Sequence, residues 1–153
     1  QNVLSKNRNI MLNQFELIPD GEYPGLGPVF DVVVDGESLL SKVAEFELRY
    51  SDSINGSYVP GLNTVGLNRS MLETPGRIFP LVCDCGEWQC WVLSVEVILC
   101  EDFVYWSQWT NPNRDDKSKK GDGLYWSYKE FPALVFDKKD YLRKLLAAIE
   151  LLT

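Results

Sequence analysis

The feature that most constrains the fold is a pair of β-rich runs separated by only two residues. The runs 91–100 and 103–109 are rich in β-branched and aromatic side chains, and Glu101 and Asp102 alone lie between them. Two strands joined by so short a loop form a tight antiparallel hairpin. Alternate residues of a strand share a face, so the first run has one apolar face, formed by Trp91, Leu93, Val95, Val97 and Leu99. In the second run, Phe103 and Tyr105 lie opposite Val104 and Trp106.

Further strands are predicted on both sides of this hairpin. Residues 10–18 alternate, with Met11, Phe15 and Leu17 on one side, and a Pro/Gly-rich stretch joins them to the β-rich run 29–34. This arrangement is typical of a second antiparallel hairpin. Short strands are expected at 78–82, 124–128 and 133–136. By contrast, the Ser-, Asn- and Gly-rich stretch 51–76 predicts a long structureless segment, with room for a short helix near Met71.

Two helices are expected beside the strands. The first is the favoured interpretation of the segment 37–50: it begins at about Ser38, because strong helix formers dominate the sequence there. The alternative for the same segment is a strand, because Ala44, Phe46, Leu48 and Tyr50 also alternate with polar residues. The second is the last element of the chain, with Asp137 as its N-cap. Its apolar stripe is expected to face the sheet and consists of Tyr141, Leu142, Leu145, Leu146, Ile149 and Leu152. The sequence therefore predicts an α+β fold: an antiparallel β-meander with one or two helices packed on one face, including this amphipathic C-terminal helix, as a single domain over residues 1–153.

Composition excludes several classes of function. The chain of 153 residues contains no histidine, which excludes Ser-His and Cys-His nucleophiles, histidine metal ligands and an imidazole base. Its net charge of −7 disfavours nucleic-acid phosphates and favours basic partners. Carboxylate pairs are expected by chance among 22 acidic residues, and no spacing indicates a substrate. We therefore expect a binding protein without an enzymatic activity and without a cofactor.

Three of the four cysteines form an unusual cluster. Cys83, Cys85 and Cys90 have the spacing C-x-C-x₄-C, whereas Cys100 lies ten residues further along the chain. One interpretation is a zinc site or a redox module, but thiolate zinc sites have four ligands. A ten-residue strand spans roughly 33 Å, which places Cys100 out of reach. For the redox version, nearby acidic residues oppose formation of a thiolate. The favoured interpretation is that small thiols pack at the end of a strand.

The same segment carries a resemblance. The pattern C-x-C-G-E-x-x-C-W that starts at Cys83 is followed by V-x-W at Val104, P-x-R at Pro112, W-x-Y at Trp126 and F-D at Phe136. This order resembles a widespread group of small bacterial cytosolic proteins, most of them without an assigned function. The resemblance implies a cytosolic location, but it carries little functional content and supplies no catalytic residues. Val92 stands where members of the group often have proline.

Size, acidity and the lack of catalytic side chains also resemble the immunity proteins of polymorphic and contact-dependent growth inhibition toxins. This analogy implies that the chain neutralises a basic, possibly nuclease, bacterial toxin domain through direct binding. An acidic protein associates rapidly with such a partner because long-range charge steers the encounter. The predicted contacts are Glu101 and Asp102 at the hairpin tip, with Trp106 and Trp109 as aromatic anchors. The alternative for these residues is an ordinary solvated turn beside core tryptophans.

The expected location is the cytoplasm. The clustered cysteines do not have the spread of a secreted disulfide framework, and the first residues lack the basic-then-apolar order of a signal peptide. No apolar run approaches the roughly 18 residues that a membrane-spanning helix requires. The sequence therefore predicts no membrane association, no nucleic-acid partner and one protein partner, a basic toxin domain.

Overall fold

A computed structural model describes residues 11–50, 58–72, 75–84, 91–115, 121 and 126–152. Its strands are β1 (Phe15–Tyr23), β2 (Gly27–Val34), β3 (Glu37–Ser38), β4 (Tyr58–Pro60), β5 (Gly76–Cys83), β6 (Val92–Leu99), β7 (Phe103–Thr110) and β8 (Leu134–Asp137). Its helices are α2 (Leu39–Glu47), α3 (Thr64–Leu72) and α4 (Lys138–Leu152).

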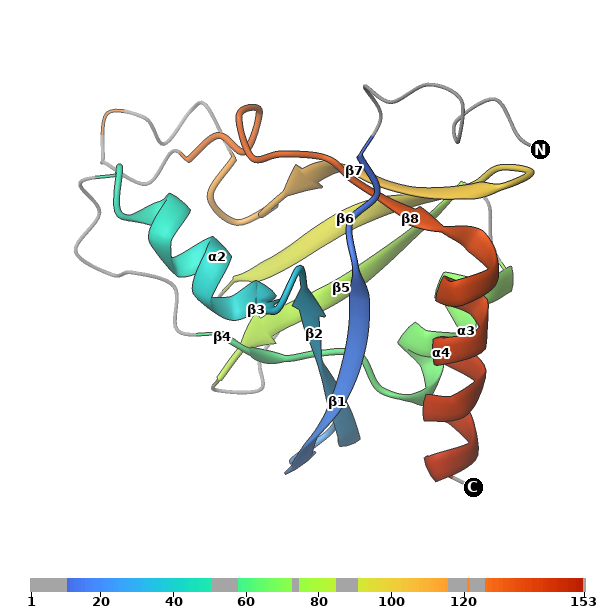
Figure 1. The fold of residues 1–153 in the computed structure, drawn as a ribbon. Coiled ribbons are helices and arrows are strands. Elements are labelled where there is room, and N and C mark those ends of the chain that lie inside the picture. Colours follow the sequence, from blue (N-terminus) through green and yellow to red (C-terminus); the bar gives the residue numbers. More distant parts are fainter. Residues whose placement is uncertain are drawn as a thin grey trace.

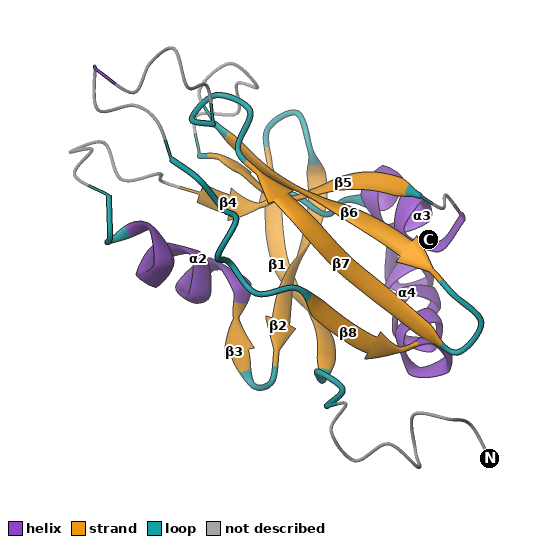
Figure 2. Ribbon diagram, turned by 90° about the horizontal axis from the view of Figure 1, so that it is seen from above, coloured by secondary structure: helices purple, strands orange, loops and turns teal. Residues whose placement is uncertain are grey.

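The predicted α+β fold and its antiparallel meander are confirmed. Strands β4 to β8 form a five-stranded antiparallel sheet in sequence order, and β1 to β3 form a separate three-stranded sheet. The β1–β2 hairpin and helices α3 and α4 lie on the same side of the five-stranded sheet (Figures 1 and 2). Both sheets contribute side chains to one hydrophobic core, which includes Phe15 from β1, Val95 from β6 and Tyr141 from α4.

The predicted β6–β7 hairpin forms as expected. The Cys100 N–H donates to the Phe103 carbonyl at 2.8 Å, which closes a loop containing only Glu101 and Asp102. Leu93, Val95 and Val97 of β6 are fully buried. From β7, Val104 and Trp106 are buried as well. The inward face of this hairpin therefore follows the alternation of its sequence.

A β-bulge in β7 then changes which residues face the core. Ser94 pairs with Thr110 and Glu96 with Ser107, so β7 uses one more residue than β6 over this interval. Gln108 has a φ of 55°, a left-handed conformation that is uncommon outside glycine. The Arg77 guanidinium donates to the Gln108 carbonyl at 3.0 Å and to Ser94 Oγ at 2.8 Å. The extra residue brings Trp109, three positions after Trp106, onto the same inward face.

Both predicted helices are present; Asp137 caps α4 as predicted, and Ser38, the expected start of the first helix, is the N-cap of α2. Ser38 Oγ accepts from the Leu40 N–H at 3.2 Å at the start of α2. The Asp137 carboxylate accepts from the Asp140 N–H at 3.0 Å at the start of α4. One member of the predicted apolar stripe is wrong: Leu146 is 51 % exposed, because the face of α4 that packs on the core is centred on Tyr141, Leu145 and Ala148 instead.

The prediction of a structureless segment over 51–76 is wrong for the described part of it. Residues 58–60 form β4 at the edge of the sheet, and the helix expected near Met71 is a full nine-residue helix, α3. Asn63 caps α3, because its side-chain oxygen accepts from the Gly66 N–H at 3.2 Å. A three-residue strand and a helix that contains glycine give weak sequence signals.

Two smaller predictions also fail. Residues 126–128 do not form a strand, and residues 124–125 of that predicted strand lie outside the described residues. Met11 precedes β1 and is 83 % exposed, so it does not share the buried face of Phe15. In addition, β1 continues through Pro19 as far as Tyr23. A shift in the pairing register between Pro19 and Glu22 keeps the expected loop residues Asp20 and Gly21 within the strand.

Candidate functional site

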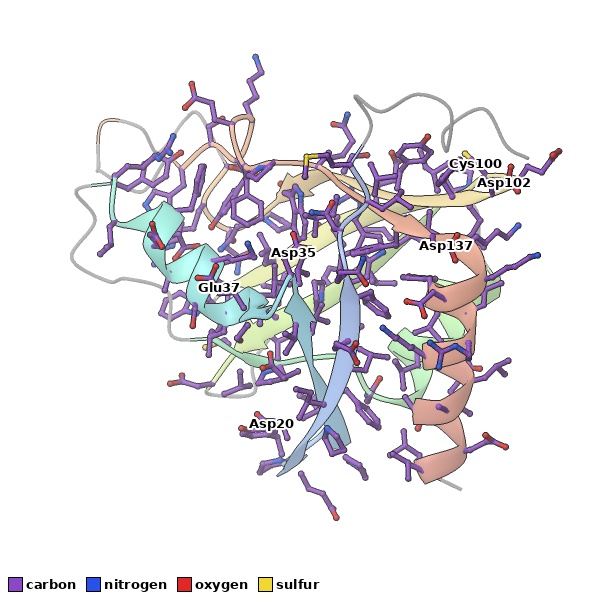
Figure 3. The ribbon with its side chains drawn as sticks, viewed as in Figure 1. Asp20, Asp35, Glu37, Cys100, Asp102 and Asp137 are labelled. Atoms are coloured by element: carbon purple, nitrogen blue, oxygen red, sulfur yellow. The ribbon has the colours of Figure 1, made fainter. Side chains whose placement is uncertain are left out.

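The predicted acidic contacts lie at one end of the five-stranded sheet. Glu101 and Asp102 are both exposed in the β6–β7 loop. The exposed Asp137 joins them, since it is the β8 partner of Phe103, and the Lys138 N–H donates to the Asp102 carbonyl at 3.0 Å. Figure 3 shows Asp102 and Asp137 close together at this end of the molecule. We call Glu101, Asp102 and Asp137 the acidic tip.

The two tryptophans predicted as anchors are in the core instead. Trp106 has no exposed surface, and its indole N–H donates to Tyr141 Oη at 3.0 Å. Trp109 is 6 % exposed, and its indole N–H donates to the Pro132 carbonyl at 3.1 Å. The two residues are therefore core tryptophans beside a solvated turn, as the alternative interpretation has it. Neither ring presents its face to a partner beside the tip.

The opposite face of β6 and β7 carries two other aromatic residues, Phe103 and Tyr105. Ile98 and Tyr105 are cross-strand partners and are both half-buried. Phe103 and Ser107 lie in the same row of β7 and are half-buried as well. The described helices α3 and α4 lie on the other side of the sheet (Figure 2). We call the surface formed by Ile98, Phe103, Tyr105 and Ser107 the outer face.

At the far end of β7 lies a cluster of buried polar side chains. Glu47 at the end of α2 is 2 % exposed, and it accepts hydrogen bonds from the Tyr58 hydroxyl at 2.8 Å and from the Tyr128 hydroxyl. The Asn111 side-chain amide donates to Tyr58 Oη at 3.0 Å. Burial, together with the nearby Glu47 charge, raises the pKa of both tyrosines far above the ordinary value, so both remain protonated donors. We call Glu47, Tyr58, Asn111 and Tyr128 the buried polar cluster.

The turn after β7 connects this cluster to the surface. Asn111 Oδ1 accepts from the Asn113 N–H at 3.0 Å, an Asx turn that starts the segment. Asp115 Oδ2 accepts from the Asn111 N–H at 2.9 Å and from the Thr110 hydroxyl. Burial raises the pKa of Asp115, although these two hydrogen bonds oppose the shift. Sequence analysis did not select any of these residues, and the Asn-Pro dipeptide at 111–112 is the signal that predicts such a turn.

Arg114, in the same turn, is held between two aromatic rings. Its guanidinium carbon lies 5.1 Å from the Trp91 ring centroid and 4.8 Å from that of Trp126. The Trp126 N–H also donates to the Arg114 carbonyl at 2.7 Å. Arg114 is only 6 % exposed. The P-x-R and W-x-Y parts of the resemblance pattern therefore meet in space, and here their role is to fix the turn on the sheet.

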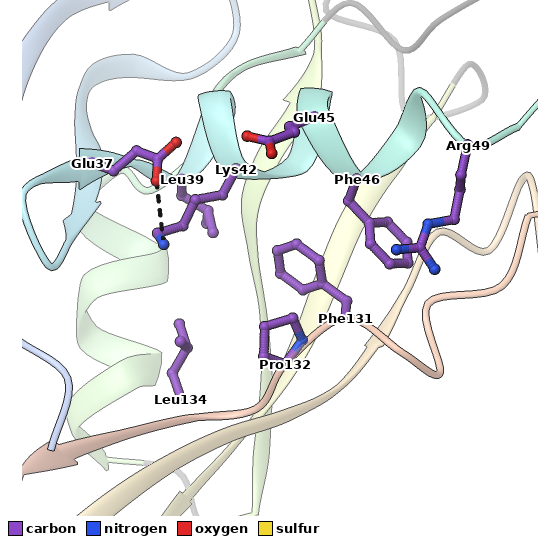
Figure 4. Close-up of a pocket in the computed structure, with 9 residues that line it drawn as sticks. All are labelled: Glu37, Leu39, Lys42, Glu45, Phe46, Arg49, Phe131, Pro132 and Leu134. Atoms are coloured by element: carbon purple, nitrogen blue, oxygen red, sulfur yellow. Dashed lines mark ion pairs between the residues drawn. The ribbon is translucent and has the colours of Figure 1, made fainter. Parts of the chain in front are cut away.

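Two hollows flank the segment 127–134, and Phe131 lines both of them. The first, of about 340 Å³, lies between α2 and residues 131–134 (Figure 4). Its cations have their own partners: Lys42 pairs with Glu37 at 3.4 Å, and Arg49 pairs with Glu130 at 2.7 Å. Both cations among its lining residues are therefore already paired, and the hollow offers a new ligand an apolar floor.

The second hollow, of about 490 Å³, lies between the β7 bulge and the segment 127–133. Gln108 and Ser107 line it from the sheet, and Lys129 lines it from the facing segment. The half-buried carboxylate of Asp115 also lines it. We call this hollow the β7 cleft. It opens beside Ser107, the last residue of the outer face, so the outer face connects the acidic tip to the cleft.

The predicted thiol cluster is described only in part. Cys83 ends β5 and is buried, and its thiol lies 3.8 Å from an Asp84 carboxylate oxygen. Cys85 and Cys90 lie outside the described residues. Within the described ranges, no three His, Cys, Asp or Glu side chains are grouped closely enough to hold a metal ion. Cys100 is exposed at the end of β6 remote from Cys83, so it is not part of this cluster.

Comparison with known proteins adds no functional assignment. No protein-family model matches the chain, and no curated protein or solved structure matches it. None of the helices in the described part of the chain is long and apolar enough to span a membrane. The functional argument therefore depends on the acidic tip, the outer face and the β7 cleft.

Proposed function

We propose that this chain is an acidic cytoplasmic binding protein that neutralises a basic bacterial toxin domain by direct contact, as immunity proteins do. The observation that carries the proposal is the position of the acidic tip at the edge of the outer face, a sheet surface on the side opposite α3 and α4. Charge at the rim accelerates association, and half-buried aromatic residues beside it supply contact area.

The proposal replaces the predicted anchors with their strand neighbours. Tyr105 and Phe103 lie on the outer face, whereas Trp106 and Trp109 face the core. Tyrosine is among the residues that contribute most to binding energy at protein interfaces. In this arrangement the tip attracts the basic partner, and Tyr105 with Ile98 forms the centre of the contact.

The first test is direct binding to a purified basic bacterial toxin domain from a gene next to the one for this chain, once sequencing of that neighbourhood identifies it, measured by calorimetry at two salt concentrations. We expect submicromolar affinity that weakens as salt increases. Absence of binding even at micromolar concentrations contradicts the proposal.

Charge reversal then locates the surface. Glu101→Lys at the tip and Glu22→Lys at the exposed end of β1 change the net charge equally but lie on different parts of the molecule. We expect Glu101→Lys to lower the association rate by about tenfold, and Glu22→Lys to lower it about twofold or less. Equal effects of the two variants indicate that net charge alone attracts the partner, and they contradict a specific site at the tip.

The apolar part of the surface is tested with Tyr105→Ala. We expect it to increase the dissociation rate by about tenfold or more, with a smaller effect on association. Because Tyr105 also packs on the sheet, its unfolding free energy is measured in parallel. Val65→Ala, at an exposed side chain of α3 on the opposite side of the sheet, is the matched control and leaves both rates unchanged.

A further inference from the structure

The β7 cleft has walls suited to a cationic group. Trp109, Tyr128 and Phe131 are core residues, each at most 7 % exposed, and the small part of each that is exposed contributes to its lining. The Phe131 ring packs edge-on against Trp109, with centroids 4.9 Å apart, and against Tyr128 at 6.4 Å. The Trp109–Pro132 hydrogen bond fixes these rings relative to the facing segment. Aromatic faces attract ammonium and guanidinium groups, and guanidinium groups also stack on them.

Asp115 gives the cleft its negative charge. Its Oδ2 atom is occupied by the Asn111 N–H and the Thr110 hydroxyl. Its Oδ1 atom is buried and has no hydrogen-bond partner in the described part of the chain, where no ion pair to Asp115 is found either. Buried polar atoms in folded proteins nearly always have a partner. A cationic hydrogen-bond donor in the cleft would place a positive charge next to the Asp115 carboxylate, which has no ion-pair partner among the described residues.

The position of the cleft connects it to the proposed binding surface. Ser107 belongs both to the outer face and to the cleft lining. An eight-residue strand such as β7 spans roughly 26 Å, so the acidic tip and the cleft lie at the two ends of one continuous strip. A strip of this length fits within an interface of ordinary size, about 800 Å² on each partner.

We propose that the β7 cleft receives an arginine side chain of the basic partner, with its guanidinium against the aromatic walls and beside Asp115. This inference rests on the proposed function and adds a second, specific anchor to it. Lys129 at the rim has the same charge as the guest and opposes its entry. The aromatic rings favour arginine over lysine, because a planar, delocalised guanidinium stacks on them and is more weakly hydrated than a compact ammonium group.

The test uses the isolated protein and a small probe, so that it does not depend on the partner. N-acetyl-arginine amide is titrated into the protein while the indole N–H signals are followed by NMR. We expect a saturable shift of the Trp109 signal, and weaker shifts with N-acetyl-lysine amide. A Trp109 signal that does not move, or equal shifts with N-acetyl-glutamate amide, overturns the proposal.

Two variants separate charge recognition from structural effects. Asp115→Asn keeps an oxygen that accepts from Thr110 and Asn111, and we expect it to weaken probe binding about fivefold or more. Lys129→Gln, at an exposed side chain, should tighten binding about twofold. Glu22→Gln, at the exposed end of β1 and outside the proposed binding surface, also removes one carboxylate; it is the control and should leave probe binding unchanged. Tightening by Lys129→Gln supports the proposal even if Asp115→Asn fails to fold, whereas weakening by Lys129→Gln contradicts it.

The outcomes distinguish this inference from the function on which it rests. If the partner binds and Glu101→Lys slows its association, but the probe does not bind the cleft, only the arginine anchor is wrong. If the probe binds and the partner does not, the cleft is a cation site and the proposed toxin-neutralising function is wrong.

Discussion

The two ends of β7 use polar residues in opposite ways. At the Phe103 end, Glu101, Asp102 and Asp137 are exposed, and their charges act on the surroundings through solvent. At the Thr110 end, Glu47 and Asn111 are buried and hydrogen-bonded within the protein. Exposed charges contribute little to the free energy of folding, but they attract oppositely charged molecules through solvent. A buried polar group that is left without a hydrogen-bond partner lowers the stability of the fold. Acidic side chains therefore occupy two different settings: the tip carboxylates are exposed, where we propose that they attract a partner, and the Glu47 carboxylate is buried and hydrogen-bonded within the protein.

The largest expected effect comes from removing one hydroxyl at the buried end. Tyr58→Phe deletes the donor to Glu47 and the acceptor for Asn111. We expect it to lower the free energy of unfolding by about 2–3 kcal/mol, because it leaves buried polar groups short of partners. Urea denaturation measures the change.

The matched control for this variant is Tyr105→Phe, at a half-buried tyrosine of the outer face. It removes the same atom from a surface that solvent reaches, so we expect a change within about 0.5 kcal/mol. Equal losses in the two variants contradict the distinction between the two ends of the strand.

An intermediate effect is expected in the pH dependence of stability, where Asp115 and Asp140 differ in sign. Burial raises the folded-state pKa of Asp115 above its ordinary 3.8, so its contribution to stability falls as pH rises from 3.8 through the folded value. At Asp140, burial alone raises the pKa, but hydrogen bonds and charges from Lys144 and Arg143 outweigh it, and the net shift is downward. Its contribution is fully present above 3.8 and is lost as pH falls through the folded value.

Urea denaturation of the wild type, Asp115→Asn and Asp140→Asn between about pH 3 and pH 7 separates these contributions. Asp115→Asn should remove a decline in stability toward neutral pH, and Asp140→Asn should remove a loss toward acid. The effect of Asp140 should also weaken in salt, because Arg143 and Asp140 are partly exposed. Variants whose pH profiles change in the same direction contradict these assignments.

The smallest expected effect on folding is at the acidic tip. Glu101→Gln combined with Asp102→Asn should change the free energy of unfolding by no more than about 0.5 kcal/mol, because both side chains are exposed. The same double variant should slow association with the basic partner. A large loss of stability instead indicates that the tip is structural, and it removes the support for a recognition role.

Sequence reasoning predicted the parts of this fold that depend on local pattern. The alternation of β6 and β7, the two-residue loop, the start of α2 near Ser38 and the cap at Asp137 are each encoded within a few neighbouring residues. It failed where the deciding contact is remote. The short β4 strand exists because it pairs with β5, and α3 is placed by packing more than by propensity. Of the predicted surface contacts, the acidic tip residues are exposed, but the two tryptophans are not.

By itself, the sequence determined that this protein has no imidazole chemistry, has a strong negative charge and is built on an antiparallel hairpin with an acidic loop. Only the tertiary structure decided which aromatic residues face outward. The bulge at Gln108 reverses the side-chain alternation within β7, and the packing of the helices selects the buried face. The buried polar cluster likewise unites Glu47, Tyr58, Asn111 and Tyr128, which are far apart in the chain. Local pattern fixes periodicity, but burial and pairing depend on contacts between distant segments.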